Sequence, residues 1–368
     1  MNFGFTEEQT LLREQARRFL DDEASMSVVR ELMHSDQGFS TAQWQQLANL
    51  GWLGLIIDPD HGGVGLNWVD LIVVLEEMGR SLYPSPFIST TLAASVLGDL
   101  GSDEQKKDWL PGMATGQQIA TLALFDRHGD PIAENITLAA EEADGLVLNG
   151  TKQFVADAGS ADLFITACRS GGSLKLALIP RTAEGVSVTA TATMDRTKRT
   201  GALELSNVHV AANDVINLSN DDLSRIVDKG VVAITAEMVG AGEQVLEITT
   251  GYARERIQFG HPIGKYQGVK HTLADVYVDV ESFKSLVYYA AWTIDHSPEE
   301  LPRSASLAKA YASDAFAEIG INGVQLHGAI GFTEEYDIQL YLKRSKWARP
   351  IFGDSDHHYE RVARMAGL

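Results

Sequence analysis

The first third of the chain carries its apolar residues at helical spacing. Thr6 and Gln9 form a capping box, after which apolar side chains recur at the spacing of one helix face. Ser102 opens a further helix, which Pro111 and Gly112 should break. Between these two helices, the same pattern predicts helices over residues 43–50, 68–78 and 89–100.

Near Gly116 the pattern changes to short apolar runs separated by Gly, Asp, Asn and Ser, which is typical of β-strands. Helical spacing returns near Asp221 and continues to the end. We therefore assign an N-terminal helical domain (1–115), a middle β domain (116–212) and a C-terminal helical bundle (213–368), and expect the outer helical parts to pack together. The predicted strands cover residues 119–124, 136–140, 146–148, 154–155, 163–167, 174–179, 186–190 and 202–210.

Composition narrows the class of protein. The 45% apolar fraction is ample for a packed core, and a net charge of −20 argues against nucleic-acid binding. Cys168 is the only cysteine, so an intrachain disulfide or a multi-cysteine metal site is impossible, and we expect no metal. No signal peptide is visible and no apolar run reaches the roughly 18 residues of a membrane span. We expect a soluble, cytoplasmic protein without a membrane partner.

Two segments carry candidate chemistry. Residues 256–267 read R-I-Q-F-G-H-P-I-G-K-Y-Q and are followed by L-A-D, and residues 325–336 read Q-L-H-G-A-I-G-F-T-E-E-Y. The forked donors of Arg256 suit a diphosphate, although a solvated arginine at a helix end has the same sequence. The glycines of the second segment suit either an interhelical turn or close approach to a ligand. We expect His327 to be structural.

In this order and spacing, the two segments resemble the acyl-CoA dehydrogenase family. The resemblance extends over the rest of the chain at lower specificity. It implies an α+β fold of that type, with a helical N-terminal domain, a central β-barrel-like domain and a C-terminal four-helix bundle. It also implies FAD as cofactor, α,β-desaturation of an acyl-CoA thioester, and an electron-transfer flavoprotein or similar acceptor.

The resemblance further assigns residues to FAD. Arg256 matches the family's diphosphate ligand, Phe259 the residue that packs on the flavin nucleotide, and Gln267 a glutamine near the adenine end. Ser355 stands for a family threonine. Gln325, Gly328, Ala329 and Gly331 match a family segment that receives the FAD adenosine and diphosphate from a neighbouring subunit. This match implies an oligomer.

Around the flavin ring the chain departs from the family. Phe154 replaces the tryptophan that covers the isoalloxazine, and Ala156 replaces the threonine that hydrogen-bonds the flavin. Residues 124–130 stand where the family has T-E-P-x-A-G-S-D, and they lack its hydroxyl groups.

The catalytic glutamate is missing as well. Gly353 and Gly230 occupy the two positions at which the family places it. Asp354 or Glu237 could substitute as the base, because a carboxylate in an apolar cleft has a raised pKa. For Asp354 we favour the alternative of a helix N-cap, and for Glu237 that of a buried hydrogen-bonding or salt-bridged residue.

The chain keeps the residues for the FAD diphosphate but lacks the catalytic base. In this combination it resembles one subunit of a heteromeric acyl-CoA dehydrogenase that acts on CoA thioesters of bulky ring compounds, including shortened steroid side chains. A second chain of the same fold, in a tetramer, would supply the glutamate and the flavin-ring contacts. Two alternatives stay open: a self-sufficient homotetramer with a displaced base, and a catalytically silent scaffold.

Overall fold

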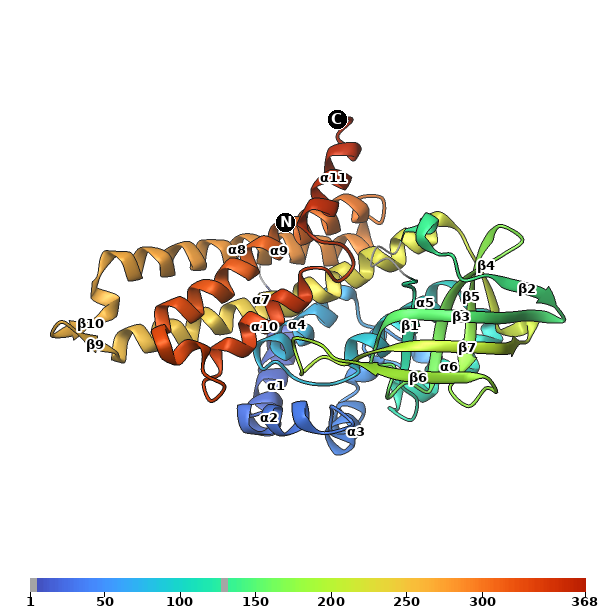
Figure 1. Ribbon diagram of the computed structural model, residues 1–368, viewed down its shortest axis with the longest axis horizontal. Helices are drawn as coiled ribbons and strands as arrows, with labels where there is room; N and C mark the ends of the chain where they lie inside the picture. Colours follow the sequence, from blue (N-terminus) through green and yellow to red (C-terminus); the bar gives the residue numbers. More distant parts are fainter. Residues whose placement is uncertain (1–4, 127–131) are drawn as a thin grey trace. The chain divides into compact units, whose positions relative to one another are not determined.

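The computed structural model describes residues 5–126 and 132–368 (Figure 1). The helices are α1 (Glu7–Glu23), α2 (Met26–His34), α3 (Thr41–Asn49), α4 (Trp68–Arg80), α5 (Phe87–Leu100), α6 (Asp103–Ala114), α7 (Asn220–Glu255), α8 (Gln267–His296), α9 (Leu301–His327), α10 (Ile338–Ala348) and α11 (Ser355–Met365). The strands are β1 (Ala120–Ala123), β2 (Ala140–Ala143), β3 (Gly145–Ala156), β4 (Leu163–Ser170), β5 (Ser173–Pro180), β6 (Val186–Thr191), β7 (Thr200–Val210), β8 (Val215–Leu218), β9 (Ile257–Gln258) and β10 (His261–Pro262).

The chain forms two compact units, and two of the boundaries between them fall inside α2 and α7. The first, here called the helical unit, contains residues 5–30, 68–83 and 231–368. The second, the mixed unit, contains residues 31–67 and 84–230. Helices from both ends of the chain thus belong to one unit, as expected, whereas α3, α5 and α6 belong with the strands. The division at residues 115 and 212 made from the sequence stays a prediction.

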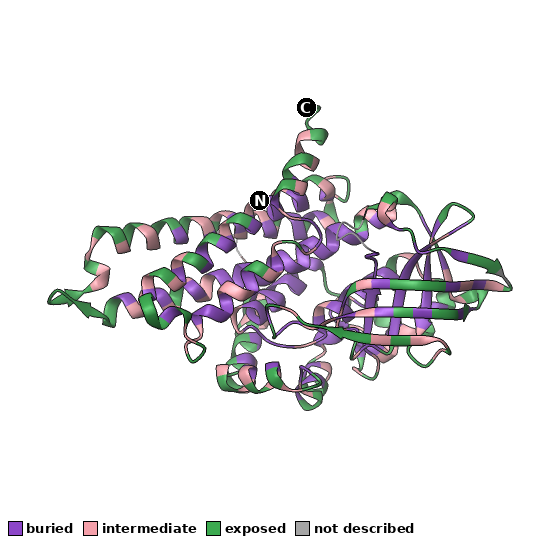
Figure 2. Ribbon diagram, viewed as in Figure 1, coloured by how far each residue is buried: buried purple, intermediate pink, exposed green. Residues whose placement is uncertain are grey.

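In the helical unit, α9 packs against α8, α10 and α11, and α4 packs against α1 and α8. Figure 1 shows α7 and α8 joined at one end by the β9–β10 hairpin. Two glycines bring α4 and α7 together: a Cβ on Gly79 would collide with the backbone of Glu237, and one on Gly240 with the backbone of Glu76. The inward faces of these helices are buried (Figure 2).

The mixed unit contains two four-stranded sheets. One has the order β1-β4-β5-β8, with β1 and β4 parallel, and the other the antiparallel order β2-β3-β7-β6. Apolar residues from both sheets form a common core that includes Leu148, Val155, Phe164, Ile179 and Leu203. Strand β3 changes register against β7 between Lys152 and Val155, and this bulge contains Phe154.

The helix–strand–helix order predicted from the sequence is confirmed, and Thr6 caps α1 in a capping box. Two local predictions were wrong, and one strand was missed. Helix α6 continues through Pro111 to Ala114, although an interior proline loses a hydrogen bond and crowds the preceding turn. Residues 136–139 form no strand before β2 begins at Ala140, and the short strand β8 was missed. Within the described residues, no helix has both the length and the apolar character needed to cross a bilayer.

Candidate functional site

The first candidate segment begins where α7 ends. The Arg256 N–H donates to the Tyr252 carbonyl over 2.8 Å, and the chain then turns back through the β9–β10 hairpin. Phe259 and Gly260, at the centre of the hairpin, have φ of 52° and 80°. Positive φ at both central residues is the geometry of a type I′ turn, for which glycine is favourable and phenylalanine is not. The unfavourable backbone holds the Phe259 ring 91% exposed.

Arg256 itself is exposed. Within residues 5–126 and 132–368, its guanidinium has no hydrogen-bond or ion-pair partner, while its backbone carbonyl accepts from the Ile263 N–H over 2.8 Å. The backbone on both sides of the side chain is therefore fixed, and the forked donors remain available for a ligand.

The start of α8 is tied to the same hairpin. The Tyr266 hydroxyl donates to the Gln258 carbonyl over 3.0 Å, and the Phe259 and Tyr266 rings meet edge-on with centroids 6.4 Å apart. Gln267 follows as the first residue of α8 and is exposed. The structure thus brings Arg256, Phe259 and Gln267 together at one end of the helical unit.

The second segment follows α9. Gln325 lies exposed in the last turn, and its carbonyl accepts from the N–H of Gly328, which has φ of 66°. A Cβ on Gly328 would meet nothing within 4 Å, so glycine is favoured here by the positive φ and not by crowding. The space beside its Cα is open. Gly331 is different: it is buried, and its Cβ would lie 2.5 Å from the Val324 carbonyl oxygen. Ala329, between them, is exposed.

His327 precedes this turn and is buried, as expected for a structural histidine. Its Nδ1 lies 2.7 Å from the Gly323 carbonyl oxygen, and burial lowers the pKa of the imidazole. Its ring stacks on Tyr252, with Tyr336 beside them. The sequence reasoning missed both tyrosines, although Tyr252 lies one helical turn before Arg256 and Tyr336 ends the glycine-rich segment.

The positions that face the flavin ring in the family offer no hydroxyl here. Phe154 is 49% exposed, with φ of 53°, and Ala156 contributes its carbonyl to a 2.7 Å hydrogen bond from the Thr121 hydroxyl. Of the segment 124–130, residues 127–130 lie outside the described part. Asp126 is buried and pairs with Lys152, whose pKa is lowered by burial, with Nζ and Oδ1 2.7 Å apart. This pair was also missed, although Lys152 lies at an inward-facing position of β3.

Gly353 has φ of 96°, a backbone angle that disfavours any side chain. A Cβ there would lie 2.6 Å from the His357 ring and 3.0 Å from Nε2 of His358. The His358 ring is buried, and its Nε2 donates to the Phe352 carbonyl over 2.9 Å. A glutamate at position 353 therefore cannot be accommodated without moving these histidines. Gly230, the other standard position, is a buried residue of α7.

The substitute carboxylates have local partners. Asp354 caps α11, where its Oδ1 accepts from the His357 N–H over 3.0 Å, so the N-cap interpretation is confirmed. Ser355 is fully buried, and its hydroxyl donates to Asp314 Oδ1 over 2.8 Å and accepts from Arg349 over 3.2 Å. This hydroxyl already has two partners within the protein.

Glu237 is buried on α7, and its Oε2 lies 3.4 Å from Nη1 of Arg344 on α10. The salt-bridged interpretation is therefore confirmed. The carboxylate of Glu237 is thus already engaged by a side chain of the same protein.

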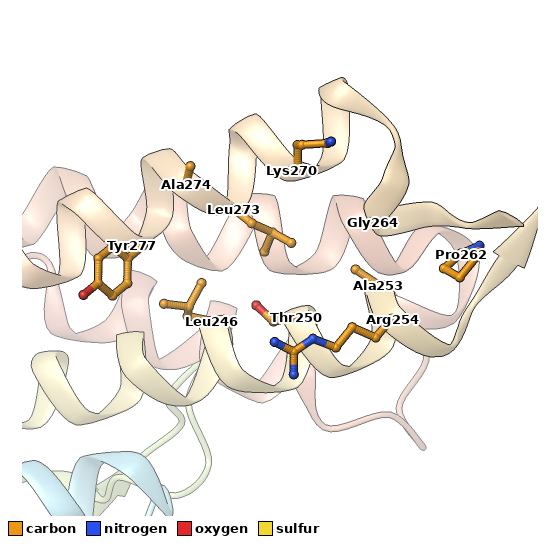
Figure 3. A pocket seen from close by; sticks show the side chains of 10 residues that line it. All are labelled: Leu246, Thr250, Ala253, Arg254, Pro262, Gly264, Lys270, Leu273, Ala274 and Tyr277. Carbon is orange, nitrogen blue, oxygen red and sulfur yellow. The ribbon is translucent and has the colours of Figure 1, made fainter.

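A pocket of about 560 Å³ opens between α7 and α8 (Figure 3). Leu246, Leu273 and Tyr277 supply apolar surface, and Arg254 and Lys270 supply charge. Pro262 and Gly264 of the first candidate segment also line this pocket, but among the described lining residues none is assigned to FAD by the resemblance.

Comparison with known proteins identifies the family. Residues 6–117, 126–208 and 225–367 match the family models described as acyl-CoA dehydrogenase N-terminal, middle and C-terminal domain, respectively. The chain belongs to the acyl-CoA dehydrogenase family. The predicted fold class is thereby confirmed. The family uses FAD, so this acyl-CoA dehydrogenase is a flavoprotein and an oxidoreductase that acts on an acyl-CoA.

Individual relatives match over nearly the full length. "Acyl-CoA dehydrogenase IpdE2" of Mycolicibacterium smegmatis is 32% identical, over 97% of this chain and 98% of its own. The structure titled "Crystal structure of the ChsE4-ChsE5 complex from Mycobacterium tuberculosis" is similar with a TM-score of 0.93 and 27% identity, over 100% of this chain and 99% of that one. The structure titled "Tcur3481-Tcur3483 steroid ACAD G363A variant" has a TM-score of 0.91 and 29% identity, over 98% of both chains.

Proposed function

We propose that this chain is one subunit of a heteromeric acyl-CoA dehydrogenase that shares its active site with a different chain of the same fold. In this arrangement, the chain binds the diphosphate and adenosine of FAD. The partner chain supplies the catalytic glutamate and the contacts to the flavin ring.

One observation carries the proposal: the surroundings of Gly353 exclude a glutamate. Its φ of 96° and the two histidines beside it are incompatible with a long side chain. The nearest substitutes, Asp354 and Glu237, hold a helix end and a buried guanidinium, respectively. Desaturation still needs a base at the α-carbon, and a second chain is the remaining source.

The donor groups support binding of one half of FAD. The exposed guanidinium of Arg256 and the exposed ring of Phe259 suit a diphosphate beside a nucleotide. The open backbone at Gly328 lets a ligand approach closely. The side that would meet the isoalloxazine presents Phe154 and Ala156, which offer no hydroxyl to the ring. The chemistry of these residues therefore favours a divided cofactor site.

The chemistry that FAD supplies when bound is acceptance of a hydride from the β-carbon, while a carboxylate takes the α-proton. In the proposed complex, Arg256 neutralises the diphosphate and orients it through its forked donors. Phe259 excludes water from the nucleotide. The product is an α,β-unsaturated thioester, and an electron-transfer flavoprotein or a similar acceptor removes the electrons.

We infer that the substrate is the CoA thioester of a bulky ring compound, such as a degraded steroid. One of the two similar structures supports this substrate class, because it is described as a Tcur3481-Tcur3483 "steroid ACAD". The other, a ChsE4-ChsE5 complex, supports the pairing of two different chains. Both are similar to this chain over nearly its whole length.

The test is to purify the chain alone and together with a chain of the same fold that is encoded beside it and has a glutamate where this one has Gly353. Flavin absorbance per chain and turnover of ring-bearing acyl-CoA thioesters are then measured. We expect less than one FAD per chain and almost no turnover in the isolated chain, with both rising on mixing. One full FAD per chain and full turnover in the protein purified alone would contradict a shared site and support the self-sufficient homotetramer.

The silent scaffold makes a different prediction. If this chain only stabilises its partner, Arg256→Ala should leave the FAD content of the mixed complex unchanged. If it shares the cofactor site, the same substitution should release FAD from the complex while the two chains remain associated.

A further inference from the structure

One aromatic contact joins the two candidate segments. Tyr252, in the last turns of α7, stacks on His327, the last residue of α9, with ring centroids 4.4 Å apart and planes inclined by 30°. The Tyr252 hydroxyl also donates to the His327 carbonyl over 3.3 Å. Tyr336 completes the cluster, with its ring centroid 5.0 Å from that of His327 and 6.5 Å from that of Tyr252.

Each member of the stacked pair lies directly beside a candidate cofactor residue. The Tyr252 carbonyl accepts the Arg256 N–H over 2.8 Å, so Tyr252 lies one helical turn before the point where the hairpin leaves α7. His327 precedes Gly328, where the chain leaves α9 with φ of 66°. The ring and hydroxyl of Tyr252 thus reach from the base of one segment to the base of the other.

The histidine is itself held in one orientation. A carbonyl oxygen only accepts, so the 2.7 Å contact with Gly323 makes Nδ1 the donor and leaves Nε2 unprotonated. Nε2 is buried and has no partner within the described residues. Burial also lowers the pKa of the ring, which favours the neutral form. A neutral ring with a fixed tautomer gives Tyr252 a defined surface to stack on.

We propose that Tyr252 and His327 are positioning residues that hold the Arg256 hairpin and the Gly328 turn in a fixed relation, so that both reach the same FAD diphosphate and adenosine. This inference rests on the proposed function. Segments that are already ordered lose less conformational entropy on binding, so the pair contributes to FAD affinity without touching FAD. Neither residue is a catalytic residue.

The test uses the complex of this chain with its partner and measures the Kd for FAD by flavin fluorescence. Tyr252→Leu and His327→Leu should each weaken FAD binding by roughly tenfold, and the double variant should be about as weak as either one, because contacting residues that act as a unit are not additive. Tyr252→Phe, which keeps the stacked ring, should restore most of the affinity. Tyr311→Leu is the matched control, since the Tyr311 hydroxyl bonds Asp279 over 2.8 Å between α9 and α8, far along α9 from His327.

A second measurement follows the loop directly. In the flavin-free complex, Tyr252→Leu should speed hydrogen exchange of the Gly328–Phe332 amides, although the substitution is on a different helix. This readout remains valid if FAD binding is lost completely. If the leucine variants do not assemble, Tyr252→Phe and His327→Phe retain the ring volume and should show the same effects at smaller size.

The outcomes separate the two proposals. If Arg256→Ala weakens FAD binding while Tyr252→Leu and His327→Leu behave like Tyr311→Leu, the positioning role is wrong and the shared site stands. Additive losses in the double variant would also overturn it. If Arg256→Ala leaves the affinity unchanged as well, the assignment of these segments to FAD is wrong, and this inference falls with it.

Discussion

The Glu237 carboxylate lies 3.4 Å from the Arg344 guanidinium, and both side chains are almost completely buried. Removing one charge from such a pair takes an ion-pair partner from the other charge, which stays buried. We expect Glu237→Gln to lower the free energy of unfolding by about 3–5 kcal/mol, measured by denaturant titration. Turnover per assembled complex should fall by less than tenfold, because we propose that the partner chain supplies the base. Glu247→Gln is the control, since Glu247 lies on the same helix in an exposed pair with Arg80 and should cost less than about 1 kcal/mol.

Arg256→Ala should release FAD without unfolding the protein. A charge-assisted hydrogen bond contributes roughly 1.5–3 kcal/mol, so FAD should dissociate on the order of ten- to a hundredfold more readily. Arg256→Lys should recover only part of the affinity because the forked donors are lost. Arg254→Ala is the matched control: it removes an exposed arginine of the same helix end that lines the α7–α8 pocket instead. Unchanged flavin content after Arg256→Ala would make Arg256 an ordinary surface residue.

Asp354→Asn should be nearly silent, because asparagine also caps helices, whereas Asp354→Ala should destabilise the protein by about 1 kcal/mol. Loss of a general base typically costs roughly 10²–10⁴-fold in rate, and we expect neither variant to lose more than about tenfold. The measurement is turnover of the complex with an artificial electron acceptor. A flavin-loaded homomer that turns over acyl-CoA and is inactivated by Asp354→Asn would identify Asp354 as the catalytic base.

Gly353→Glu should fail to create a base. The backbone angle alone should cost roughly 1–2 kcal/mol, and the contacts with His357 and His358 should add to that cost. We expect a lower unfolding midpoint and no gain of turnover in the isolated chain. Gly172→Ala measures the cost of the backbone angle without the cost of steric contacts. Gly172 has φ of 85°, and a Cβ added there would meet nothing within 4 Å. A stable Gly353→Glu chain that desaturates acyl-CoA alone would contradict the proposed role of the partner.

His358 should make the protein sensitive to acid. Burial lowers the pKa of His358 to about 3, whereas an unfolded histidine titrates near 6.5. Between these values the unfolded state binds the additional proton, so the stabilising contribution is present above about pH 6.5 and is lost as the pH falls toward 3. The slope is at most about 1.4 kcal/mol per pH unit. The difference in unfolding free energy between the wild type and His358→Gln, measured from pH 7.5 down to 4.5, should shrink accordingly, and parallel curves would contradict the prediction.

Features that depend on neighbours in the chain could be predicted from the sequence. The capping box at Thr6 and the N-cap at Asp354 are set by residues three positions apart, and both were foreseen. Strand β8 was missed because four residues carry too short a pattern, and their pairing with β5 is a tertiary contact. Proline was given too much weight in α6, where the surrounding helix outweighs one lost donor.

The same distinction between local and tertiary features applies to the candidate site. The residue types at Arg256 and at Gly353 could be read directly, because each follows from a motif. The stacking of Tyr252 on His327 could not, since it joins helices that are far apart in the chain. Nor could the sequence reveal the positive φ at Gly353 or the histidines that crowd it, because both depend on how α11 packs. The sequence showed that the glutamate is missing, and the structure shows why it cannot simply be replaced.

The crowding at Gly353 has an evolutionary consequence. Two of the four glycine codons become glutamate codons by a single base change, so a glutamate at position 353 can arise from one mutation. Its product would suffer from the wrong backbone angle and from two obstructing rings before it could offer any catalytic advantage. Natural selection would therefore act against the intermediate, and a glutamate at position 353 would need accompanying changes at His357 and His358. Under the proposed shared site, such a chain depends on its companion, and the genes for the two would be inherited and lost together.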